Sequence, residues 1–147
     1  MQELLTQIFS IYIAGITGLY KGVPIGFALH SAPVLTALFT ALGSVTIVLV
    51  IFFSGKSMKN WFLRNFGKKK LEKRGGLFTR ILNKYGLAGI GLFAPGIIGP
   101  IGTVLLGLVV LKDTKYFLPY LITGIFLWSI ALTTVGYYSI DLVTEFL

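Results

Sequence analysis

The sequence predicts an all-α integral membrane protein, first because it is strongly apolar and second because its charges are confined. Hydrophobic residues make up 55% of the 147 residues, and the mean hydropathy is +0.86. A soluble domain of this length could not cover so much apolar surface. No charge occurs in residues 4–20, 22–55, 85–111 or 116–140, and a helix that crosses a bilayer needs about 20 apolar residues. We expect one membrane domain over residues 1–147, in a cell (inner) membrane.

The basic residues indicate which side of the membrane each segment faces. Ten of the 13 Lys and Arg lie in residues 56–84, and Lys112 and Lys115 lie in a short link. Basic residues are retained on the cytoplasmic side. We therefore expect residues 56–84 and the 112–115 link to be cytoplasmic. The net charge of +8 would suggest nucleic acid as the partner of a soluble protein, but this placement argues against that partner.

Two uninterrupted apolar segments predict helices that cross the bilayer. Residues 34–55 predict one such helix, which starts outside and reaches the cytoplasmic segment. Residues 116–140 predict the second, which leaves the cytoplasmic 112–115 link. The C-terminus is then outside, as the acids Asp141 and Glu145 favour.

Residues 85–111 predict a re-entrant hairpin rather than a crossing. Both flanks, Lys84 and Lys112, should stay inside. Prolines and glycines interrupt the middle of the segment, at Pro95-Gly96 and Gly99-Pro100, and proline removes a helix donor and clashes with the preceding turn. The two arms, 85–94 and 101–111, are each about 15 Å long as helices, or half a bilayer.

The first third of the chain supports two interpretations. Residues 4–20 and 25–32 form two arms around a break at Tyr20-Lys21-Gly22-Val23-Pro24, which makes a second hairpin that enters from outside. Alternatively, residues 4–20 cross the membrane completely and the N-terminus is inside. In both cases Pro33 opens the long helix.

Two short segments suggest an internal repeat. Residues 24–29 read PIGFAL and residues 100–105 read PIGTVL, and each precedes a long apolar helix. Hairpin then helix, twice and from opposite sides, is an inverted-topology repeat, with repeat 1 over 1–55, the basic amphipathic linker over 56–84 and repeat 2 over 85–147. Chance likeness between apolar segments is the alternative.

At these segments the chain resembles the small multidrug export protein family of the DedA-like superfamily. Residues 20–45 read YKGVPIGFALHSAPVLTALFTALGSV, and residues 84–107 read KYGLAGIGLFAPGIIGPIGTVLLG. The resemblance implies paired re-entrant hairpins, a transport role and lipid-like substrates. The sequence departs from the family in two places: no acid precedes Lys21, and Ile97 and Ile98 stand where relatives carry an arginine after Pro-Gly. Proton coupling through a carboxylate is therefore not expected.

Both predicted turns are candidate substrate-binding sites. Lys21 is the only base outside the cytoplasmic segments; it could attract an anionic head group or extend to the outer interface. An imidazole such as that of His30 can relay protons near neutral pH or cap a helix. Glycines permit close backbone approach, and a helix that starts at Pro100 would offer N–H groups to an anion. The candidate residues are Lys21, Gly22, Pro24, Gly26 and His30 in the first turn, and Pro95, Gly96, Gly99, Pro100 and Gly102 in the second.

The basic linker predicts a surface for anionic lipid. It divides at Gly75-Gly76 into two amphipathic helices, and in the second Leu77, Phe78, Ile81, Leu82 and Tyr85 oppose Arg80, Asn83 and Lys84. Helices of this kind lie in the membrane interface and are attracted to anionic lipid.

The function expected from these features is transport and not catalysis. The chain has one histidine and no cysteine, and it lacks the glycine motifs of nucleotide binding, so we expect no enzyme, metal or cofactor. A small exporter or flippase of amphipathic substrates, acting as a homo-oligomer such as a dimer, is the first hypothesis. The alternatives are a membrane scaffold that binds lipid or partner helices, and an ion channel, whose polar lining is sparse here.

Overall fold

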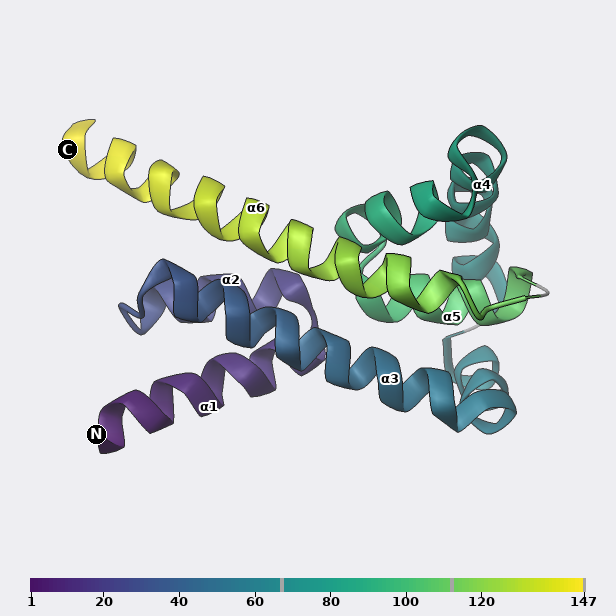
Figure 1. The fold of residues 1–147 in the computed structure, drawn as a ribbon, viewed down its shortest axis with the longest axis horizontal. Helices are drawn as coiled ribbons and strands as arrows, with labels where there is room; N and C mark the ends of the chain where they lie inside the picture. Colours follow the sequence, from purple (N-terminus) through teal and green to yellow (C-terminus); the bar gives the residue numbers. More distant parts are fainter. Residues whose placement is uncertain (67, 112, 147) are drawn as a thin grey trace. The chain divides into compact units, whose positions relative to one another are not determined.

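A computed structural model of the chain confirms the all-helical prediction. It describes residues 1–66, 68–111 and 113–146, which contain six α-helices and no strand. The helices, drawn in Figure 1, are α1 (Gln2–Thr17), α2 (Leu19–Ala28), α3 (Pro33–Phe66), α4 (Lys68–Ile97), α5 (Pro100–Val110) and α6 (Phe117–Phe146).

The helices form two compact units that do not follow chain order. Unit 1 consists of Met1–Thr46 and Phe126–Leu147, and unit 2 consists of Ile47–Ile125. Unit 1 therefore holds α1, α2, the start of α3 and most of α6. Unit 2 holds the rest of α3, α4, α5 and the start of α6.

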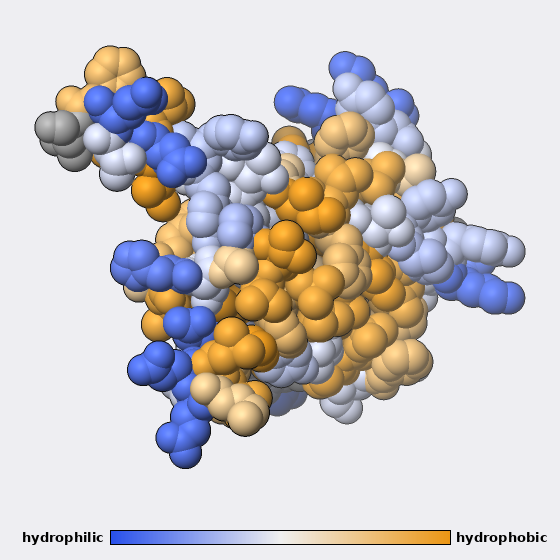
Figure 2. Space-filling view, turned by 60° about the vertical axis from the view of Figure 1, so that its left-hand side comes forward, coloured by the Kyte–Doolittle hydropathy of each residue, from blue (hydrophilic) through white to orange (hydrophobic). Residues whose placement is uncertain are grey.

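Two of the helices are long and apolar enough to cross a membrane. They are Pro33–Gly55 within α3 and Phe117–Phe146, which is α6. Only 39% and 28% of their most apolar windows are buried in the protein, whereas the core helix of a soluble domain would be mostly buried. Hydrophobic residues also make up much of the surface in Figure 2. The predicted helix over 34–55 is confirmed, and the helix predicted over 116–140 continues to Phe146.

The remaining helices include two helical hairpins, and each hairpin turns at a glycine. In unit 1, α1 packs along α2 across Gly18 (φ 142°, ψ 152°). In unit 2, α4 packs along α5 across Gly99 (φ 96°, ψ 155°). This region of backbone space is accessible essentially only to glycine. The two interruptions therefore have the same physical origin.

The first break lies earlier than the sequence predicted. It falls at Gly18, and the expected break at 20–24 lies inside α2, which contains Pro24. The prediction was wrong because proline fixes φ near −65°, which is a helical value. Pro24 can thus continue a helix, whereas reversal of the chain requires the positive φ that Gly18 adopts.

The second break is narrower than predicted. Helix α4 runs through Pro95 to Ile97, so its arm is longer than the expected 85–94. Only Ile98 and Gly99 lie between the two helices, and α5 starts at Pro100. Proline suits this first helical position because its missing N–H would have no partner there.

The expected division of the basic linker at Gly75-Gly76 is also wrong. Helix α4 passes through this pair and is kinked instead at Gly86 (φ 70°), while α3 is kinked at Gly55 (φ 56°). A glycine inside a helix costs only about 1 kcal/mol relative to alanine. The burial of Phe78, which is fully inaccessible in unit 2, is large enough to offset that cost.

Candidate functional site

A side chain from α3 hydrogen-bonds a backbone carbonyl at the C-terminal end of α1. The last carbonyls of a helix have no partner within the helix. Here the Gly15 carbonyl accepts hydrogen bonds from the Gly18 N–H (3.1 Å) and from the Ser44 Oγ (2.8 Å). Because Ser44 is fully buried, this carbonyl at the end of α1 is hydrogen-bonded within the protein.

The backbones of α1 and α3 touch where two glycines meet. A Cβ atom on Gly15 would lie 2.6 Å from the Thr40 carbonyl oxygen, and one on Gly43 would lie 2.9 Å from the Ile16 nitrogen. No side chain fits at either position. Glycines at such crossings allow the close approach that holds helices together where lipid supplies no hydrophobic driving force.

Helix α2 packs on α3 through a second pair of small residues. A Cβ on Gly22 would lie 2.7 Å from the Thr40 Oγ1, and one on Gly26 would lie 2.5 Å from the Thr36 Oγ1. Gly22 and Gly26 therefore lie on the buried side of α2, and Lys21 is exposed. A substrate role for the two glycines stays a prediction.

Hydroxyl groups line the interior of unit 1. Thr36 and Thr40 are fully buried and Thr133 is 2% exposed, and none of the three hydroxyls has a hydrogen-bond partner. An unsatisfied buried polar group costs about 1–3 kcal/mol. Unit 1 therefore holds unused, uncharged hydrogen-bonding capacity.

Sequence reasoning missed these hydroxyls, although a signal was present. Thr36, Thr40 and Ser44 recur every four residues of an otherwise apolar helix, and Ser129 and Thr133 do the same in α6. That spacing places each set on one helix face. In the structure the Ser129 Oγ donates to the Ala37 carbonyl (2.7 Å) and joins α6 to α3.

The backbone conformation of His30 caps the C-terminal end of α2. His30 is the only residue other than glycine with positive φ (52°) among the residues described. The Ser31 N–H bonds the Gly26 carbonyl (3.1 Å) and the His30 N–H bonds the Phe27 carbonyl (3.0 Å), which is the Schellman pattern. The imidazole is exposed, so the structure supports the capping role that the sequence left open, and proton relay stays a prediction.

The link after His30 is fixed by α1 and α6. The Tyr137 hydroxyl donates to the Ser31 carbonyl, and the Gln7 Nε2 donates to the Leu29 carbonyl (3.0 Å). The Tyr137 ring also meets Phe27 edge to face, with centroids 4.6 Å apart. The short connection between α2 and α3 is therefore ordered by contacts within unit 1.

The second turn lies in unit 2. Pro95, Gly96 and Pro100 are buried, whereas Gly99 and Gly102 are partly exposed. The Gly99 carbonyl accepts from both the backbone N–H (2.9 Å) and the hydroxyl (2.7 Å) of Thr103. These two bonds fix the start of α5.

Two glycines also meet in unit 2, where α4 crosses α6. A Cβ on Gly124 would collide with the Gly91 carbonyl oxygen and lie 3.0 Å from the Leu92 Cα. Pro95, four residues after Gly91, has no N–H to donate to that carbonyl. The Gly91 carbonyl therefore faces the Gly124 Cα, as in the Cα–H···O contacts found between closely packed helices.

The two units share a spacing that differs from the expected sequence repeat. As many residues separate the break glycine Gly18 from the crossing glycine Gly43 as separate Gly99 from Gly124. The PIGFAL and PIGTVL segments do not occupy equivalent positions, because Pro24 lies inside α2 whereas Pro100 begins α5. The likeness between the units thus rests on glycine positions.

Comparisons of the chain with family models, with curated protein sequences and with solved structures each found no match. The resemblance to the small multidrug export family stays a prediction.

Proposed function

We propose that this chain is a multi-pass membrane transporter or flippase for amphipathic, lipid-like or lipophilic molecules, of the small multidrug export type. The observation that carries the proposal is the pair of glycine breaks, Gly18 and Gly99, each inside an apolar helical hairpin. In a bilayer, irregular backbone is tolerated only where protein or a water-filled cavity covers it. Secondary transporters build their substrate sites from such discontinuous helices.

In this proposal the two hairpins are re-entrant and enter from opposite sides. The basic segment 56–84 is cytoplasmic, so the hairpin of α4 and α5 enters from the cytoplasm and that of α1 and α2 enters from outside. The matched spacing of break and crossing glycines supports two related halves. Because 147 residues provide few helices to seal a pathway, the working form is a homo-oligomer, most simply a dimer.

Two features of unit 1 supply the recognition chemistry. The partnerless hydroxyls of Thr36, Thr40 and Thr133 offer hydrogen bonds to a polar group that enters an otherwise apolar interior. Lys21, exposed in the first turn of α2, supplies the one basic side chain of this unit for an anionic head group.

Reconstitution into liposomes tests the proposal. We would measure scrambling of a fluorescent phosphatidylglycerol and efflux of a lipophilic cationic dye for wild type, Lys21→Ala and Gly99→Leu. Wild type should exceed empty liposomes, Lys21→Ala should lose mainly the anionic lipid flux, and Gly99→Leu should lose both. Lys115→Ala, which removes an exposed base elsewhere, is the control. Wild-type flux at the level of empty liposomes would favour a membrane scaffold.

A separate test concerns the hydroxyls. Thr40→Val keeps the side-chain shape and removes one unsatisfied polar group, so stability should stay equal or rise. If the hydroxyl contacts substrate, flux should fall although the thermal unfolding temperature does not. Thr123→Val, whose hydroxyl already bonds the Pro119 carbonyl at an exposed site, should leave flux unchanged. Wild-type flux in Thr40→Val would remove this residue from the pathway.

A further inference from the structure

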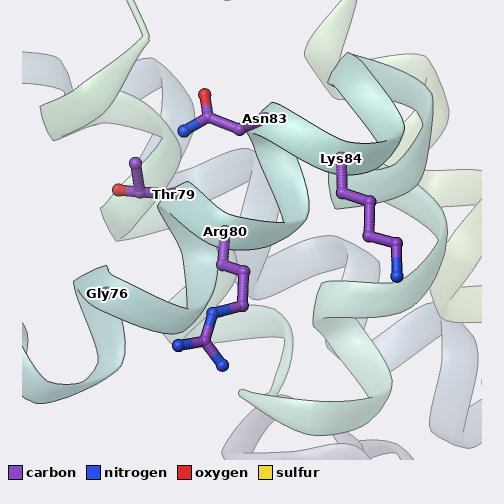
Figure 3. A pocket seen from close by; sticks show the side chains of 5 residues that line it. All are labelled: Gly76, Thr79, Arg80, Asn83 and Lys84. Carbon is purple, nitrogen blue, oxygen red and sulfur yellow. The ribbon is translucent and has the colours of Figure 1, made fainter.

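The outward face of α4 between residues 76 and 84 carries a basic depression. It is lined by Gly76, Thr79, Arg80, Asn83 and Lys84 (Figure 3). The opposite face of the same segment is occupied, because Phe78 is fully buried and Ile81 is 8% exposed. Part of the apolar side is therefore used for packing within the protein, whereas Leu77 and Tyr85 on that side and the basic side chains remain exposed.

The depression has the chemistry of a phosphate site. Arg80 and Lys84 are exposed, lie one helical turn apart and extend from the same side of the helix in Figure 3. Among the described side chains neither forms a salt bridge with an acid. Asn83 also lines the depression, but in Figure 3 its side chain points away from those of Arg80 and Lys84. Nothing lies within 4 Å of the position that a Cβ on Gly76 would take. A guanidinium binds phosphate oxygens in a bidentate manner, and a lysine adds a compact positive charge.

Exposed apolar residues continue from this depression along α4. Tyr85 follows Lys84 directly and is 55% exposed, and its ring lies 5.7 Å from that of Phe93, which is 48% exposed. A basic group beside exposed aromatic rings suits a ligand with a charged head and an apolar tail. Free phosphate would contact only the basic group and not the aromatic rings.

We propose that this face of α4 binds the phosphate head group of an anionic glycerophospholipid, with an acyl chain along Tyr85 and Phe93. The inference rests on the membrane location in the proposed function and not on transport. The lipid belongs to the cytoplasmic leaflet, where the basic segment is expected.

Native mass spectrometry of the full-length protein tests the site. Protein purified in detergent would be incubated with phosphatidylglycerol or with phosphatidylcholine of the same acyl chains, and bound lipids would be counted. Wild type should retain phosphatidylglycerol preferentially. In Arg80→Gln/Lys84→Gln that retention should fall about tenfold, as expected when charge-assisted contacts are lost.

The matched control is Arg64→Gln/Lys115→Gln, which also removes one arginine and one lysine, both exposed. It should retain the lipid as wild type does. An equal loss in the control would overturn the site in favour of diffuse charge attraction, and equal retention of phosphatidylcholine would overturn it outright.

Two further measurements distinguish a lipid head group from free phosphate, and a loss of binding from a loss of folding. Bound phosphatidylglycerol would be challenged with millimolar inorganic phosphate or with a short-chain phosphatidylglycerol. If phosphate displaced the bound lipid as efficiently as the short-chain lipid did, the acyl chain would contribute nothing to binding, and the lipid assignment would be overturned. Circular dichroism should show the same helicity for both double variants. Lipid binding is counted without any measurement of flux, so the two proposals can fail separately. A wild-type protein that supports dye efflux but does not retain phosphatidylglycerol preferentially would contradict this inference alone. A wild-type protein that retains the lipid but supports no flux would contradict only the transport proposal.

Discussion

Single glycines decide where this chain changes direction. Gly18 and Gly99 turn the two hairpins, and Gly55 and Gly86 kink the helices on either side of the basic segment. Nothing lies within 4 Å of a Cβ built on any of the four. Their requirement is therefore conformational and not steric.

This conformational requirement predicts a loss of stability without a clash. We expect Gly18→Ala and Gly99→Ala each to lower the free energy of unfolding by about 1–3 kcal/mol, because this backbone region is nearly closed to other residues. Gly76→Ala, which has equal space but helical φ, should change little or stabilise. Thermal unfolding in detergent micelles measures all three. Unchanged stability of both turn variants would show that the backbone relaxes at those positions.

His30 gives the opposite prediction at the residue scale. Because it occupies a positive-φ cap, His30→Gly should raise the free energy of unfolding and His30→Val should lower it, by about 1 kcal/mol in each direction. Thermal unfolding in detergent micelles measures both variants. Flux should survive His30→Gly if only the backbone matters. A stable His30→Gly protein that has lost transport would instead support the proton relay.

At the scale of elements, glycine contacts determine which helices pair. Helix α1 crosses α3 at Gly15 and Gly43, and α4 crosses α6 at Gly91 and Gly124. Both long helices are thus held by the first arm of a hairpin. The sequence predicted the existence of α3 and α6 from their apolar length, but it could not predict these partners, because contact between distant residues depends on folding.

The crossings predict a steric penalty. Gly43→Ala and Gly124→Ala should each destabilise by about 1–3 kcal/mol, the usual range for overpacking, because the new methyl group would meet backbone atoms that cannot rotate away. Gly75→Ala is a suitable control, since its nearest neighbour would be the Leu106 side chain at 4.0 Å. Unfolding in a series of increasing SDS fractions would report the differences. Equal midpoints for Gly75→Ala and Gly124→Ala would contradict the close crossing.

At the scale of the whole molecule, the proposed topology can be mapped residue by residue. The native chain has no cysteine, so a single introduced thiol reports alone. In intact cells an impermeant maleimide should label Gln2→Cys and Phe146→Cys but not Asp113→Cys. Labelling of Asp113→Cys from outside would refute the cytoplasmic link. Protection of Gln2→Cys would favour the alternative in which residues 4–20 cross the membrane.

Composition and the uncharged apolar segments of the sequence were enough to predict that the chain is all-helical. The apolar segments predicted helices of membrane length, and Pro33 and Pro100 marked two helix starts correctly. These features are local, because hydropathy and the fixed φ of proline act within a few residues.

The tertiary structure alone decided what those residues touch. It moved the first break from residues 20–24 to Gly18, assigned Gly22 and Gly26 to packing against threonines, and revealed three buried hydroxyls without partners. The physical reason is that burial and hydrogen bonding arise between segments far apart in the chain. The sequence determines each segment's preferences, and only packing determines which of those preferences are satisfied.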